Sequence, residues 1–173
     1  WRAFYSGDAN NLPVSGACGA VGETSAVTPA QPQIATQATD ATVGGPIGDT
    51  ATVSGLVNPI AGAGAGTVTF RLYSDNACTN QIFVSNNRPL NLTTPTSGTA
   101  TSETFAPANT GQYFWRAFYS GDANNAPVAG ACNEPNEIVD VLPTTTTTTT
   151  TTTVPPTTAP PTTASPTTAP PTT

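Results

Sequence analysis

Residues 111–125 read GQYFWRAFYSGDANN, and this stretch does most to decide the fold that we expect. The period of two that is typical of a strand holds up to residue 120, and SGDANN is a cluster of turn-forming residues. On this strand the core face is predicted to carry Tyr113, Trp115, Ala117 and Tyr119. A second predicted strand, residues 67–74, places Val68, Phe70 and Leu72 on its core face.

Part of this stretch occurs twice in the chain. Residues 1–11 and 115–125 both read WRAFYSGDANN, and the match continues to 16 identities over 18 aligned residues, ending with Cys18 aligned to Cys132. The offset of 114 residues is close to the length of one small β-sandwich domain. The sequence therefore predicts tandem repeats.

The repeat divides the chain into three expected parts. Residues 1–26 are interpreted as the last two strands of one repeat, residues 27–142 as a complete repeat, and residues 143–173 as a stalk. Because the chain begins inside a predicted strand, we interpret it as a fragment of a longer protein.

The complete repeat is predicted to be all-β, with no helix. Its apolar residues alternate with polar ones, and Gly, Pro, Asn and Asp separate the alternating segments. The predicted strands are residues 33–42, 49–57, 67–74, 81–85, 99–106, 111–120 and 137–142. Seven short strands in about 115 residues predict an antiparallel, immunoglobulin-like β-sandwich.

Composition excludes several classes of function. The chain of 173 residues has four Arg, ten acidic residues and no His, for a net charge of −6. Without a basic patch, nucleic acid is excluded as a partner, and without His the usual general base is missing. We therefore expect no enzyme activity, no catalytic residue and no cofactor. No apolar run reaches the roughly 18 residues that cross a bilayer, so we expect no membrane insertion.

The last 31 residues, 143–173, contain 18 Thr, 8 Pro and no charged residue. A segment of this composition cannot bury a core and is expected to be disordered and extended. Its Thr hydroxyls are acceptors for O-glycosylation, and glycans would stiffen it further. Fully extended at about 3.1 Å per residue, it would reach roughly 95 Å.

The three cysteines follow the repeat. Cys18 and Cys132 are equivalent, so we predict that Cys78 pairs with Cys132, and that the partner of Cys18 lies outside this chain. Such a disulfide requires residues 125–131 to run back along the strand before them. The alternative is a pair of buried free thiols. A disulfide favours an extracellular protein.

Three segments resemble a known family: GTVTFRLYS at 66–74, TGQY at 110–113 and YSGDANN at 119–125. They resemble the bacterial immunoglobulin-like repeats found in tandem on surface proteins of high-GC Gram-positive bacteria. The resemblance implies a secreted, wall-exposed, non-enzymatic spacer or adhesive module. Its partners would be neighbouring repeats, and a cell-wall glycan or a host or environmental surface ligand.

TGQY also resembles the tyrosine corner of immunoglobulin-like domains. In that motif Tyr113 would hydrogen-bond to the chain just upstream. Antibody domains have a Cys two residues later, whereas this chain has Trp115, which we expect to fill the space of the missing disulfide.

Two groups of residues are candidate sites. Asp75, Asp122 and Asn124 lie in predicted turns and have oxygens suited to calcium, although Asp and Asn are also ordinary turn residues. The arginine–aromatic face is a predicted outward binding surface, and its alternative is a surface covered by loops or by the next repeat. This face comprises Arg71, Tyr73, Phe114, Arg116 and Phe118.

The remaining carboxylates show no pairing typical of acid/base catalysis, so we expect them to be solvated: Asp40, Asp49, Glu103, Glu134 and Glu137. Two functions therefore compete. The first is a structural or adhesive surface repeat on a Thr/Pro stalk. The second is an accessory module of a secreted polysaccharide-degrading enzyme, in which outward aromatic rings would stack on sugars.

Overall fold

The computed structural model describes residues 1–62 and 64–144, and the predicted stalk lies outside them from residue 145 on. The described chain is an all-β sandwich, as predicted. Its only helical element is a 3-10 turn, η1 (Pro135–Glu137), which the sequence did not predict. No helix among the described residues is long and apolar enough to cross a membrane.

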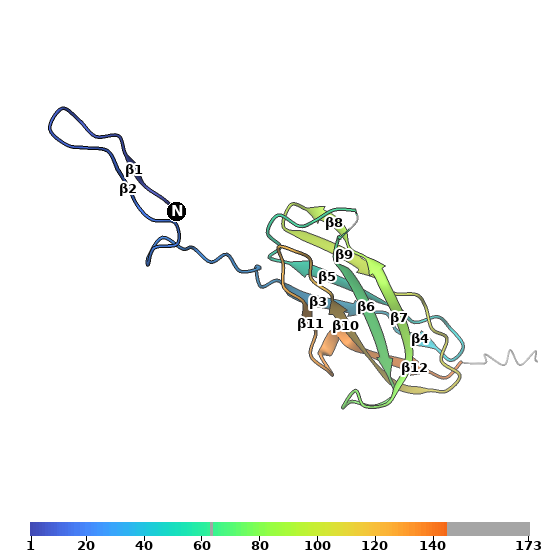
Figure 1. The fold of residues 1–173 in the computed structure, drawn as a ribbon. Coiled ribbons are helices and arrows are strands. Elements are labelled where there is room, and N and C mark those ends of the chain that lie inside the picture. Colours follow the sequence, from blue (N-terminus) through green and yellow to red (C-terminus); the bar gives the residue numbers. More distant parts are fainter. Residues whose placement is uncertain (63, 145–173) are drawn as a thin grey trace, which may run out of the picture.

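Two sheets pack face to face (Figure 1). One sheet has the strand order β3 (Gln33–Ala38), β5 (Asp49–Ser54), β9 (Ser97–Thr101), β8 (Asn91–Thr94). The other has the order β4 (Ala41–Thr42), β12 (Ile138–Leu142), β10 (Gly111–Tyr119), β6 (Thr67–Tyr73), β7 (Gln81–Pro89), and β11 (Val128–Ala129) pairs with β10 beside this path. The strand pairs are antiparallel except for β12 with β4.

The predicted strand 33–42 is two strands in different sheets. β3 pairs with β5, whereas β4 pairs with β12 across the sandwich. The chain crosses between the sheets at Thr39 and Asp40, where the Thr39 N–H donates to the Gly48 carbonyl and Asp40 accepts from the Asp140 N–H. These bonds satisfy backbone groups at the crossing.

Other strand predictions need correction at their ends. β7 extends past residue 85 through a register irregularity, where Asn87 has φ 50°, and leads to β8, which the sequence did not predict. The prediction at 99–106 is too long, because β9 ends at Thr101 and Phe105 forms only an isolated bridge with Ile47. Residues 86–95 contain several Asn and Pro residues, which are typical of turns, so the sequence did not predict the end of β7 or the pairing of β8 with β9.

The core lies between the sheets and contains the predicted side chains. Val68, Phe70 and Leu72 are buried, as are Trp115, Ala117 and Tyr119. Half-buried Tyr113 packs against this cluster. Phe83 contacts Trp115 edge to face, with ring centroids 6.0 Å apart. The core-face predictions for β6 and β10 are therefore confirmed.

Cys78 and Cys132 form the predicted disulfide, with their Cα atoms 6.0 Å apart. The bridge is possible because the chain runs back along β10 after the turn, so that Phe118 pairs with Ala129 and Tyr119 with Val128. The described free cysteine is Cys18, which is exposed. The alternative of a free Cys78 and Cys132 is wrong.

Residues 1–18 form a separate hairpin of β1 (Phe4–Tyr5) and β2 (Val14–Ser15), joined to the sandwich by an extended segment (Figure 1). Phe4 pairs with Ser15 and Tyr5 with Val14, which is the register of β10 and β11 shifted by 114 residues. The repeated sequence thus forms the same hairpin twice.

Candidate functional site

The arginine–aromatic face lies on β6 and β10, on the side opposite the core. Arg116 is directly opposite Arg71 across the strand pair, and Phe114 is opposite Tyr73. The alternation that buries Trp115 and Leu72 in the core turns these four side chains outward.

Two members of this face are not exposed, which corrects the prediction. Phe114 and Tyr73 are each only 5% exposed. The disulfide joins the two segments that border this part of the face, because Cys132 follows β11 on one side of β10 and Cys78 follows β6 on the other. The alternative of a covered surface therefore fits these two rings better than an outward binding surface does.

The accessible part of the face is Arg71, Arg116 and Phe118. Arg71 is exposed and the other two are half-buried. Each guanidinium carbon lies 4.8 Å from the centroid of the Phe118 ring, within cation–π range. The Arg116 Nε donates to the Gly130 carbonyl at 2.8 Å, which fixes that side chain. We call these three residues the arginine pair site.

The tyrosine corner forms as the resemblance implied. The Tyr113 hydroxyl donates to the Asn109 carbonyl oxygen at 3.1 Å. Trp115 is fully buried, and its Nε1 has no hydrogen-bond partner within the described part of the chain. Both residues therefore serve the fold.

The calcium candidates do not converge. Asp75 follows the end of β6, whereas Asp122 and Asn124 follow the end of the antiparallel strand β10, at the other pole. The oxygens of Asp75 accept hydrogen bonds from the backbone of Asn80, Thr79 and Ala77. Within residues 1–62 and 64–144, no three acidic, His or Cys side chains are grouped as metal ligands.

Asp122 organises its turn. Its Oδ1 accepts from the backbone N–H groups of Asn124 and Asn125, and its Oδ2 accepts from the Tyr119 hydroxyl. Burial alone would raise the pKa of Asp122, but hydrogen bonds from Asn124, Asn125 and the Ile60 N–H hold it below its ordinary value. Burial and the Asp122 charge raise the pKa of Tyr119 to about 12. Turn formation therefore accounts for the positions of Asp122 and Asn124.

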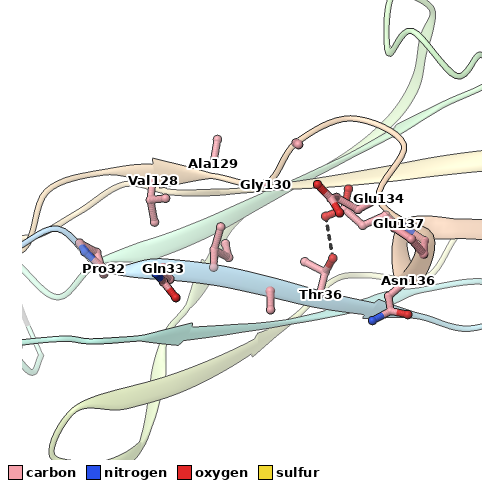
Figure 2. A pocket seen from close by; sticks show the side chains of 13 residues that line it. Pro32, Gln33, Thr36, Val128, Ala129, Gly130, Glu134, Asn136 and Glu137 are labelled. Atoms are coloured by element: carbon pink, nitrogen blue, oxygen red, sulfur yellow. Dashed lines mark hydrogen bonds between the residues drawn. The ribbon is translucent and has the colours of Figure 1, made fainter.

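A groove of about 460 Å³ lies between β3 and the chain from Val128 to Glu137 (Figure 2). At its inner end the Thr36 hydroxyl donates to Glu137 at 2.6 Å. Glu137 is 1% exposed, and its Oε2 has no partner among the described residues. Burial raises the pKa of Glu137 to about 7, and the charges of Asp49 and Glu134 add to the shift.

Asp49 is a second buried carboxyl group, on β5 of the facing sheet. It is 2% exposed, and neither carboxyl oxygen has a hydrogen-bond partner among the described residues. Burial raises its pKa to about 7. The expectation that Asp49 and Glu137 are solvated is therefore wrong.

The sequence carried a signal for both buried acids. Asp49 is in phase with Ala51 and Val53, and Glu137 is in phase with Val139 and Val141, all of which are buried. A period of two therefore places each carboxyl group on a core face. The prediction that both groups are solvated followed instead from the rule that Asp and Glu are seldom buried.

Comparisons with protein-family models, curated proteins and solved structures find no match to this chain. The site must therefore be interpreted from its own geometry.

Proposed function

We propose that this chain is part of a non-enzymatic, extracellular repeat protein of the bacterial immunoglobulin-like type, with a structural or adhesive role and a Thr/Pro-rich stalk. The observation that carries the proposal is the duplicated hairpin. A sequence repeated at an offset of 114 residues takes the same register and repeats most of its internal hydrogen bonds in both copies.

The equivalence extends beyond strand pairing. The Arg2 Nε donates to the Gly16 carbonyl as Arg116 does to Gly130. The Asp8 oxygens accept from Asn10 and Asn11 as those of Asp122 accept from Asn124 and Asn125. These repeated contacts support a tandem array of closely related domains.

The junction between repeats supports a stiff array. At the same offset, Val27 aligns with Val141 and Pro29 with Pro143, so the last strand of the first repeat would end near Thr28. Ala30 already bridges to Asn125 of the complete domain. Only Pro29 would separate the two domains, and Pro restricts the backbone. Neighbouring repeats are thus the proposed partners.

The poles of the domain also suit a head-to-tail chain. β3 begins at one end of the sandwich and β12 ends at the other (Figure 1). Tension applied through an array would therefore pass along the strands of each domain. The disulfide supports an oxidising, extracellular setting.

The alternative, an accessory carbohydrate module of a polysaccharide-degrading enzyme, has less support. Sugar stacking needs accessible rings, and the burial of Phe114 and Tyr73 removes two of the three outward rings that motivated it. Phe118 remains, but both of its neighbours are arginines stacked on the ring.

Surface labelling tests the proposal. Antibodies raised against residues 27–142 would be applied to intact and to permeabilised cells of the source organism. We expect labelling of intact cells or recovery from the culture fluid. Labelling that requires permeabilisation would contradict the extracellular role.

A further inference from the structure

The arginine pair site places two positive charges together, and no described residue forms an ion pair with either of them. Arg71 and Arg116 are directly opposite in the β6–β10 register and share the Phe118 ring. Like charges directly opposite across a strand pair destabilise the sheet. Two of the four arginines of a chain with a net charge of −6 are therefore adjacent on the same face.

No carboxylate neutralises this pair within the described residues. The one ion pair of residues 1–62 and 64–144 joins Arg88 to Glu103 at 3.3 Å, elsewhere on the domain. Glu137 is close enough to feel the charge of Arg116, but its carboxyl group is buried with Thr36 and forms no ion pair with that arginine. The terminal guanidinium nitrogens therefore remain available.

The site is also ordered before any ligand arrives. The Phe118 ring holds both guanidinium groups at 4.8 Å, and Gly130 accepts the Nε hydrogen of Arg116. Ordered guanidinium groups bind oxyanions in a fixed fork geometry and lose less side-chain entropy on binding. These features favour an anionic ligand.

We propose that the arginine pair site binds the anionic groups of an acidic polysaccharide, with Arg71 and Arg116 donating to its oxyanions. The two positive charges indicate an anionic ligand. The repeat indicates that the ligand is a polymer: Arg2 also lies 4.7 Å from the Phe4 ring, so each repeat would present a similar site. A row of equivalent sites fits a polymer with regularly spaced charges, and binding at several repeats raises the affinity.

This inference deepens the proposed function and rests on it for the extracellular setting. Its chemistry can be tested separately, with the purified 173-residue chain. Titration calorimetry at low ionic strength would compare polygalacturonate, which carries carboxylates, dextran sulfate, which carries sulfates, and neutral dextran. Polyglutamate would represent an acidic protein partner.

We expect binding to at least one charged polysaccharide, weaker binding at higher salt and none to neutral dextran. Arg71→Gln should weaken binding about tenfold, because a charged hydrogen bond is lost. The matched control is Arg88→Gln, which removes a charge outside the site and should change the affinity less than twofold, roughly within the value of a surface charge. Arg71 is exposed and makes no hydrogen bond in the described structure, so its variant should remain folded.

Three results would overturn the proposal. They are failure of both charged polysaccharides to bind, equal loss of affinity in Arg71→Gln and Arg88→Gln, and tighter binding to polyglutamate than to either polysaccharide. None of these results would contradict the repeat architecture or the surface location, which the cell-labelling experiment tests.

Discussion

The two copies of the hairpin have nearly the same sequence and nearly the same internal hydrogen bonds, but different surroundings. Trp1 is 89% exposed and Phe4 71%, whereas Trp115 is completely buried. Local contacts are therefore enough to define the turn and the register. Burial of the aromatic residues depends on strands that are distant in sequence.

The turn shows the same difference on a smaller scale. Asn125 is fully buried, where it accepts from the Val57 N–H and donates to the Val57 carbonyl. Asn11, its counterpart, is exposed and bonds only within its own turn, to Asp8. The residues of the turn are thus suited both to forming the hairpin and to joining it to a domain.

The largest expected difference between the copies is at the tryptophans. Trp115→Ala should cost about 3–5 kcal/mol of unfolding free energy, because it leaves a large cavity in the core. The matched variant Trp1→Ala should cost nothing measurable, because that ring is exposed. Chemical denaturation followed by circular dichroism measures both. Similar costs for the two variants would contradict the burial difference.

The second-largest expected difference in stability is between removing the Cys78–Cys132 bridge and replacing Cys18. Replacing both Cys78 and Cys132 with Ala should cost about 4 kcal/mol, since the bridge closes a loop of 54 residues. Cys18→Ser should leave stability unchanged. Urea unfolding of the two variants tests this, and equal unfolding midpoints would count against the bridge as a stabilising element.

The buried carboxyl groups predict an unusual dependence on pH. The pKa values of Asp49 and Glu137 are both raised to about 7 by burial, far above their ordinary values of 3.8 and 4.5. Between those values and pH 7 the folded state therefore binds more protons than the unfolded state. Stability should be greatest at the acidic end of this window and fall as the pH rises through 7.

For one such group, moving from pH 7 to pH 5 should add about 2 kcal/mol. Thermal unfolding at a series of pH values measures the effect, and Glu137→Gln should flatten the curve. Glu23→Gln, at the equivalent position of the first copy, is the matched control and should not. A domain that loses stability steadily on acidification from pH 7 would contradict the burial of both acids.

The smallest expected effect is that of removing the first copy. A chain beginning at Val27 should retain the melting temperature of the full chain, because a lone two-stranded hairpin contributes little. Calorimetry of both chains measures this. Loss of the cooperative transition would show that residues 1–26 belong to the complete domain.

The sequence predicted those parts of the structure that depend on short-range pattern. The alternation in 111–120 gave the core residues of β10, and the repeat gave the Cys78–Cys132 bridge. It could not give the crossing at Thr39 or the pairing of β8, which depend on which sheet a strand joins. Side-chain period is the same in either sheet.

The candidate site shows the same limit. The alternation correctly turned Arg71, Arg116 and Phe118 away from the core, but exposure also depends on what crosses the outer face. Phe114 and Tyr73 are buried although they alternate away from the core, and no local pattern in β6 or β10 contains that information. The site that remains is smaller and more strongly charged than the one predicted.

Hydrogen exchange followed by mass spectrometry tests the central claim most directly, because it compares the two hairpins in one molecule. Peptides that extend to Leu12 or to Ala126 distinguish the identical segments. We predict that backbone amides of β10 and β11 exchange only on global unfolding of the domain, whereas those of β1 and β2 exchange rapidly. Equal and strong protection of both hairpins would contradict the account.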